Sequence, residues 1–269
     1  MRFEWARPVL AGFRIIATRQ WSYLVWCAAV LACGLVSIAI AVALAGGPGA
    51  VVRSGQAGIG RFVLILWALG AVLGTPIVCA IYRAVLRPAD SRSAYLRLGG
   101  LELRMAGLLE PLACAWILVV DLAAAARPWS LAVSALALLA ATPFTLLGPV
   151  VFDRGRYDVG YALRLGRRFS WELLGLNILT WALIMAIDFL IHIGWSLFIS
   201  FSWEDVWAQA MDRQDPWFFA QMLVAFGIAW LFYVAELVIA VAAGAEAYRW
   251  LAGSAAATGD PARPATVQA

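Results

Sequence analysis

The sequence contains no lysine, and all twenty of its basic residues are arginine. Charge is scarce in general: charged residues make up 13% of the 269-residue chain, about half the share found in ordinary soluble domains. Hydrophobic residues make up 64%, against roughly 45–50% in soluble domains. This composition is that of a membrane protein. The exclusive use of arginine is typical of a GC-rich bacterial genome, so we assign no function to it.

Histidine and cysteine are also scarce. His192 is the one histidine, and the four cysteines lie in apolar runs without forming a CxxC pair: Cys27, Cys33, Cys79 and Cys114. Such cysteines are interpreted as small buried residues rather than disulfides or metal ligands. The sequence contains no phosphate-binding glycine loop, HExxH or GxSxG motif. We therefore predict no metal, no cofactor and no catalytic residue, and favour a protein that is not an enzyme.

Long uncharged runs dominate the chain instead. Six of them are long enough to cross a ~30 Å hydrocarbon core as helices, at 1.5 Å of rise per residue. They are continuous, whereas barrel strands would alternate, so the predicted fold is all-α: a single six-span membrane domain over residues 1–250. Pro76, Pro143 and Pro149 are expected to kink the second and fourth spans. The spans are expected at 21–44, 62–82, 108–126, 131–152, 173–201 and 217–243.

The two ends of the chain carry separate predictions. The first apolar run is longer than the hydrophobic region of a cleaved signal peptide, so we expect a retained anchor. Residues 251–269 are small and proline-bearing without periodicity. They are expected to form a disordered tail.

Arginine is distributed unevenly between the segments that join the spans. Sixteen of the twenty arginines precede the first span, follow the sixth, or lie between spans two and three or four and five. The other segments hold four arginines and the acidic residues Glu204, Asp205, Asp212 and Asp215. By the positive-inside rule, the arginine-rich segments and both termini face the cytoplasm. The predicted location is therefore the bacterial inner membrane.

The tetrapeptide LRLG occurs twice, at 96–99 and at 163–166, each time shortly before an apolar run. The N-terminal GFRIIATRQWSYL precedes the first run in the same way. A chain rich in leucine, glycine and arginine repeats some tetrapeptides by chance, so the shared position counts for more than the identity. We therefore expect three helical hairpins, each preceded by a short amphipathic helix in the cytoplasmic interface.

The arginines of these lead-in helices are candidate contacts for anionic lipid headgroups. Arg97 and Arg104 are one heptad apart and are expected on one face of the second lead-in helix. In the third, Asp158 and Arg164 intrude on the apolar face. The candidate headgroup contacts are Arg14, Arg97, Arg104, Arg164, Arg167 and Arg168.

This layout, with lead-ins such as YALRLGRRFSWELLGLNIL, resembles a loose group of bacterial six-span membrane proteins over residues 8–250. The group includes the membrane domain attached to some glycerophosphodiester phosphodiesterases, and stand-alone proteins of unknown function. The soluble phosphodiesterase domain does not occur in this sequence. The resemblance therefore implies membrane residence and nothing about hydrolysis.

Ionisable residues inside spans are costly, so each is a candidate site. Asp188 and His192 share a helix face, as a structural pair near the outer boundary or as a proton or ligand site. Glu236 is the deepest acid and is expected to approach Asn177 in the cytoplasmic half of the bundle. It is either a hydrogen-bonded structural acid or a substrate or proton site. Glu110, which precedes a proline, is interpreted as the start of a helix.

Three classes of function remain open. The leading hypothesis is a non-enzymatic membrane protein that acts through lipid or protein contacts in envelope or lipid homeostasis. Its partners would be anionic lipids, with a membrane protein or a second copy of the chain as further candidates; nucleic acid is not expected. The alternative is a small transporter or channel with a polar path through Glu236, Asp188 and His192. A membrane-embedded lipid enzyme using Glu110 or Glu236 is the third class.

Overall fold

The computed structural model describes residues 4–44, 55–90, 92–109, 111–112, 129–198 and 216–257. All regular secondary structure within these ranges is helical, which confirms the predicted all-α class. Five helical stretches of the described residues are long and apolar enough to cross a membrane. They are Gln20–Leu44, Ala68–Leu86, Ala135–Arg154, Ser170–Ile193 and Gly227–Ser254. Most of the expected third span, 108–126, lies outside the described residues, so the count of six spans stays a prediction.

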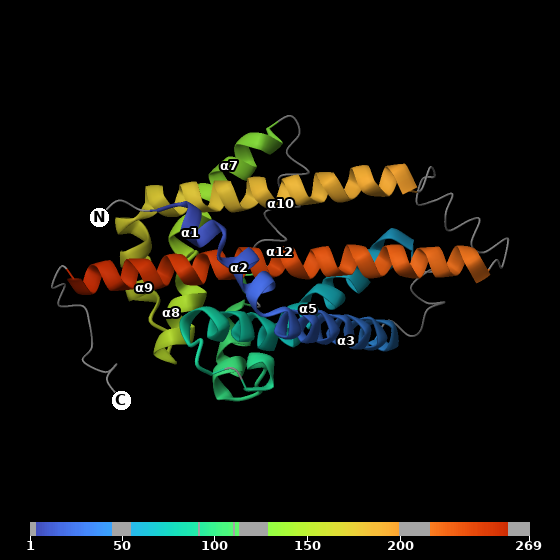
Figure 1. Cartoon of the computed structure of the whole chain (residues 1–269), viewed down its shortest axis with the longest axis horizontal. Coiled ribbons are helices and arrows are strands. Elements are labelled where there is room, and N and C mark those ends of the chain that lie inside the picture. Colours follow the sequence, from blue (N-terminus) through green and yellow to red (C-terminus); the bar gives the residue numbers. More distant parts are fainter. Residues whose placement is uncertain are drawn as a thin grey trace.

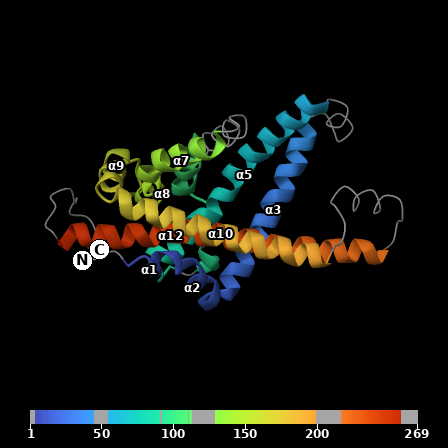
Figure 2. The same cartoon turned by 90° about the horizontal axis from the view of Figure 1, so that it is seen from above.

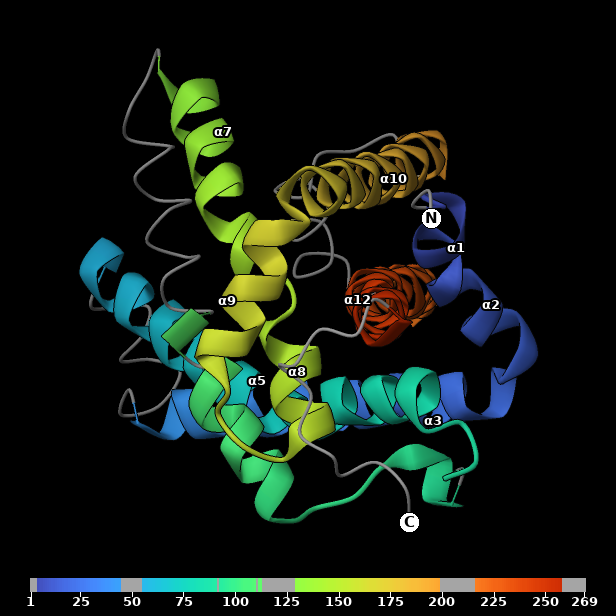
Figure 3. The same cartoon turned by 90° about the vertical axis from the view of Figure 1, so that its left-hand side faces the viewer.

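The last described helix, α12 (Pro216–Ala257), lies at the centre of the bundle, and Figure 3 shows it end-on with other helices around it. It contacts α1 (Ala6–Val9), α2 (Ala11–Thr18), α3 (Gln20–Leu44), α5 (Gly55–Leu86), α8 (Leu147–Arg154) and α10 (Ser170–Phe198). Many of its buried residues are small, among them Ala242, Ala243, Ala245 and Ala247. Small residues let neighbouring backbones approach closely, which suits a central helix.

The helices α2 and α12 pack with their backbones nearly in contact, because a Cβ added at Gly12 of α2 would lie 2.5 Å from the Cα of Ile239.

At its C-terminal end, α12 continues to Ala257 and Leu251 is fully buried. The expected tail boundary at residue 250 is therefore too early, because this packing extends the helix. Residues 258–269 lie outside the described part of the chain.

Helices α3 and α5 pack side by side and cross α12 obliquely, as Figure 2 shows. Hydrogen bonds to backbone carbonyls tie the three together: Cys33 Sγ donates to Leu73 O at 3.3 Å, and Trp230 Nε1 donates to Cys27 O at 3.2 Å. Pro76 lies inside α5, which continues past it as one helix.

The expected fourth span is divided into α7 (Ser130–Ala141), the 3₁₀ turn η2 (Thr142–Phe144) and α8. The division falls at Pro143, which has no N–H to donate to the preceding turn. Pro149 causes no comparable break, because it lies in the first turn of α8, where a missing N–H costs little. The 3₁₀ turn η2 provides the surface on which the helix that begins at Val159 packs.

The third lead-in segment forms α9 (Val159–Arg168), directly before α10. Asp158 does not intrude on its apolar face, because it is the N-cap, and its Oδ1 accepts from the Tyr161 N–H at 3.2 Å. The buried face consists of Ala162, Leu165 and Gly166. Arg164 lies on the exposed face, so the expected irregularity of this helix is wrong on both counts.

The second lead-in segment differs from the expected helix. Ser93, Ala94 and Tyr95 form a left-handed turn, with φ angles of 52°, 52° and 67°. Residues 96–98 are not helical, and the helix begins only at residue 100. Arg97 and Arg104 therefore do not share a helix face. Hydrogen bonds hold this segment in place, since Trp26 Nε1 donates to Ala94 O at 2.8 Å. The two glycines that follow LRL also favour an interruption over a continuous helix.

Candidate functional site

Four arginine-bearing segments meet at one end of the bundle, which Figure 1 shows at the left. We call it the arginine-rich end: residues 4–19, 83–104, 153–168 and 246–254. Arg249 donates to Val85 O at 3.4 Å, and Arg87 donates to Asp153 O at 3.1 Å. Tyr248 of α12 donates to Asp153 Oδ2 at 2.8 Å. The structure thus brings together the segments that the arginine distribution places on one side of a membrane.

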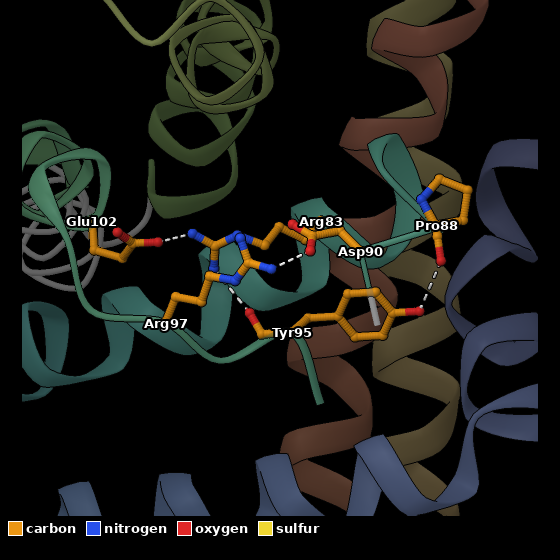
Figure 4. Close-up of polar contacts among 6 residues, drawn as sticks. All are labelled: Arg83, Pro88, Asp90, Tyr95, Arg97 and Glu102. Atoms are coloured by element: carbon orange, nitrogen blue, oxygen red, sulfur yellow. Dashed lines mark hydrogen bonds and ion pairs between the residues drawn. The ribbon is translucent and has the colours of Figure 1, made fainter. Parts of the chain in front are cut away.

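A buried ion pair lies inside this end, as Figure 4 shows. Arg83 and Glu102 bind each other, and each is 5% exposed. Arg83 also donates to Tyr95 O at 2.9 Å, and its guanidinium lies 5.6 Å from the ring centroid of Phe152. Sequence analysis did not single out this pair. Its partners are 19 residues apart in the chain, and no periodicity links them.

Two of the predicted headgroup arginines also bind other parts of the protein. Arg97 pairs with Asp90, and Arg104 donates to Gly155 O. The Tyr157 hydroxyl returns a hydrogen bond to Arg104 O at 2.7 Å. These arginines therefore hold the loops of the arginine-rich end together. Arg14 is exposed on α2.

The remaining three predicted contacts lie together on α9. Arg164, Arg167 and Arg168 are exposed and share one face of the helix, opposite its buried face. Gly166 on the buried face meets η2 so closely that a Cβ there would lie 2.9 Å from Pro143 Cα. The packing fixes the orientation of α9, so its three arginines point outward as a group.

The start of α9 is held by a charged cap. Arg154 pairs with Asp158, and its guanidinium lies 3.5 Å from the ring centroid of Tyr161. Burial by itself raises the pKa of Asp158, but hydrogen bonds from Arg154 and from the Tyr161 N–H, with the nearby positive charges, outweigh it. The net effect lowers the pKa of Asp158, so the ionised cap is favoured.

A carboxyl pair connects α10 and α12. The carboxylates of Asp188 and Glu236 lie close enough to interact electrostatically. Glu236 Oε1 is buried and has no hydrogen-bond partner among the described residues. Two adjacent carboxylates between apolar helices repel each other, so the pair is a suitable place for a shared proton or a bound cation.

Two further members of the predicted intramembrane site, Asn177 and His192, form other contacts. Asn177 donates to Thr145 Oγ1 at 2.9 Å rather than to Glu236. The expectation counted rise along each helix, which cannot reveal that the break at Pro143 places Thr145 beside Asn177. His192 is exposed, and its Nδ1 lies 3.1 Å from Asp188 O rather than against the carboxylate. Glu110 lies outside the described residues.

A third cluster joins the N-terminal segment to α12. Glu246 Oε1 accepts from Arg7 Nε at 2.9 Å and from Arg249 at 2.7 Å. Glu246 is buried, whereas about half of each arginine side chain is exposed. A cavity of about 310 Å³ opens beside the three residues, and Trp250, Gly253 and Ser254 complete its lining.

Comparison with known proteins assigns no function to this chain. No family model, no curated protein and no solved structure matches the chain. Within the part of the chain that the structure describes, no three His, Cys, Asp or Glu side chains are grouped as metal ligands. The candidate sites are therefore α9, the carboxyl pair and the Arg7–Glu246–Arg249 cavity.

Proposed function

We propose that this is an integral membrane protein of the bacterial inner membrane that binds anionic phospholipids through α9, in envelope or lipid homeostasis. The observation that carries the proposal is the orientation of α9. Its apolar face is packed against the bundle, while Arg164, Arg167 and Arg168 are exposed together directly before the candidate span of α10. With both termini in the cytoplasm, these arginines lie at the cytoplasmic headgroups.

The physical basis is the attraction between guanidinium groups and lipid phosphates. Each basic residue near an anionic membrane surface contributes about 1 kcal/mol. Three arginines on one fixed face then contribute about 3 kcal/mol, or roughly 100-fold in affinity. Guanidinium also forms paired hydrogen bonds with phosphate oxygens, which a single ammonium group cannot form.

The test is a triple variant, R164Q/R167Q/R168Q, reconstituted into vesicles of mixed phosphatidylglycerol and phosphatidylcholine. Enrichment of anionic lipid around the protein is measured by quenching from brominated phosphatidylglycerol. We expect the variant to lose most of the enrichment. A charge-matched control is R53Q/R61Q/R213Q, on the predicted opposite side of the membrane. Equal enrichment in the two triple variants contradicts the proposal.

The second candidate function is proton or cation transport through the bundle. The proximity of Asp188 and Glu236 favours it, because these are the two acids of the predicted polar path and they belong to the neighbouring helices α10 and α12. In proteoliposomes, E236Q and D188N should each abolish a proton flux that E172Q, at the start of α10, leaves intact. Flux insensitive to both changes rules this candidate out.

A further inference from the structure

The cavity beside Glu246 has the features of a built anion site. Its walls carry two guanidinium groups and one carboxylate, which leaves one net positive charge. Glu246 is 5% exposed and holds both arginines, so their positions are fixed before any ligand arrives. Arg7 binds the carboxylate through Nε, and its two terminal nitrogens lie outside that hydrogen bond. Preorganised donors of this kind suit a phosphate group.

The place of the cavity in the fold indicates a membrane-bound source of that phosphate. It lies where the candidate span of α12, Gly227–Ser254, ends, and α1 contributes Arg7 to its lining. Trp250 forms part of the lining, and tryptophan is enriched at the level of lipid headgroups. Exposure of 51% for Arg7 and 43% for Arg249 leaves the cavity open to the surroundings.

We propose that this cavity binds the singly charged phosphodiester of one glycerophospholipid headgroup. The net charge of the lining matches one negative charge. A phosphomonoester with two negative charges would place the second one near the Glu246 carboxylate, where like charges repel. The volume of about 310 Å³ exceeds what a phosphodiester alone requires. The site is separate from α9 and rests on the proposed function only in placing this end at the headgroup layer.

Gly253 offers a variant that blocks the cavity without touching the charges. A Cβ added there would meet no atom within 4 Å, so a side chain at this position extends into open space. Leucine also has a higher helix propensity than glycine, so G253L is not expected to weaken α12. The matched control is G70L, at another helical glycine that a Cβ would leave uncrowded.

The experiment is native mass spectrometry of the protein in detergent, titrated with short-chain phosphatidylglycerol, phosphatidylethanolamine and phosphatidic acid. We expect one tightly bound diester lipid per chain, at least tenfold weaker binding of phosphatidic acid, and at least tenfold weaker diester binding in G253L. G70L should bind as the original chain does. Equal diester binding in G253L and G70L overturns the proposal, as does a preference for phosphatidic acid.

Soluble probes separate the two sources of the phosphate group. Glycerophosphoglycerol should compete with the bound lipid only weakly, and inorganic phosphate should not compete. If inorganic phosphate competes as well as phosphatidylglycerol, the cavity is a free-phosphate site and the lipid assignment is wrong. The α9 proposal is tested separately: R164Q/R167Q/R168Q should keep the single bound diester lipid while losing the surrounding anionic enrichment. If that variant keeps the enrichment, the α9 proposal fails, whereas the cavity proposal fails only if the single bound diester lipid does not depend on the cavity.

A charge variant completes the design. R7K keeps the positive charge but loses the planar fork whose terminal nitrogens lie outside the bond to Glu246, so we expect weaker diester binding. Because about half of the Arg7 side chain is exposed, the melting temperature should be nearly unchanged. If R7K binds the diester as tightly as the original chain, paired hydrogen bonds to phosphate are not part of the site and the proposal fails.

Discussion

Arg83 and Glu102 bind each other out of contact with solvent, although both belong to the most highly charged part of the molecule. Removing one partner leaves a buried charge without compensation, which costs about 3–5 kcal/mol. We expect R83Q or E102Q to lower the free energy of unfolding by that amount. Denaturant titration of purified protein in detergent measures it. Replacing both residues together with methionine should restore most of the loss, because neither charge then remains buried.

The exposed pair Arg97–Asp90 is the natural comparison for this prediction. Its side chains are 45% and 31% exposed, and ion pairs of this kind contribute about 0–1 kcal/mol. R97Q should therefore leave stability almost unchanged. If R97Q lowers the free energy of unfolding as much as R83Q does, burial does not explain the contribution of the Arg83–Glu102 pair to stability.

A second prediction concerns pH and the cap of α9. Because the pKa of Asp158 is lowered in the folded protein, its charge stabilises the fold above the ordinary aspartate value of about 3.9. That contribution is lost as pH falls from about 4 through the folded pKa. D158N keeps the ability to cap but not the charge. The original chain should therefore be more stable than D158N at pH 7, with the difference disappearing at acid pH; a constant difference contradicts the assignment.

A third prediction concerns the close approach of α2 to α12. G12A places a methyl group against the backbone at Ile239, so we expect a loss of about 1–3 kcal/mol from overpacking. G70A meets no neighbouring atom and should be neutral, or stabilising by up to about 1 kcal/mol through helix propensity. Thermal unfolding in detergent compares the two. Equal melting temperatures would show that α2 does not pack against α12 in this way.

A fourth prediction distinguishes the observed neighbour of Glu236 from the one expected from helix rise. In a cysteine-free background, the pair D188C and E236C should be joined by a short bifunctional thiol reagent. The pair N177C and E236C should not be, because Asn177 faces Thr145. Cross-linking is read from gel mobility after the chain is cleaved at a protease site introduced between residues 198 and 216. A preference for the N177C pair would show that the register between the helices is wrong.

The positions of the helices can be predicted from the sequence wherever local composition determines them. Apolar runs place α3, α5, α10 and α12 to within a few residues at most ends, because crossing a membrane depends on the run itself. The gathering of the arginine-bearing segments follows from their distribution in the same way. The break at Pro143 is a local property too, since it comes from a missing N–H.

The contacts between helices could not be predicted from local composition. Asp188 and Glu236 belong to one predicted site, yet their contact depends on the relative register of α10 and α12. That register depends on tertiary packing such as that of Trp5 over Gly175. Arg83 and Glu102 are 19 residues apart in the chain, but the Arg83 guanidinium packs over Phe152 of α8, which is distant in sequence. The LRLG at 96–99 has the same sequence as the LRLG of α9 but a different structure, because hydrogen bonds from Trp26 and Arg83 hold the backbone before it in a turn.

The central position of α12 affects the order in which the protein can assemble. The helices that α12 contacts, from α1 to α10, precede it in the chain. A ribosome therefore delivers those helices to the membrane before the one that joins them. Until then, their inward faces must be covered by lipid, by the translocon or by chaperones. Chains interrupted before residue 216 would keep those faces uncovered, which makes them recognisable substrates for membrane proteases.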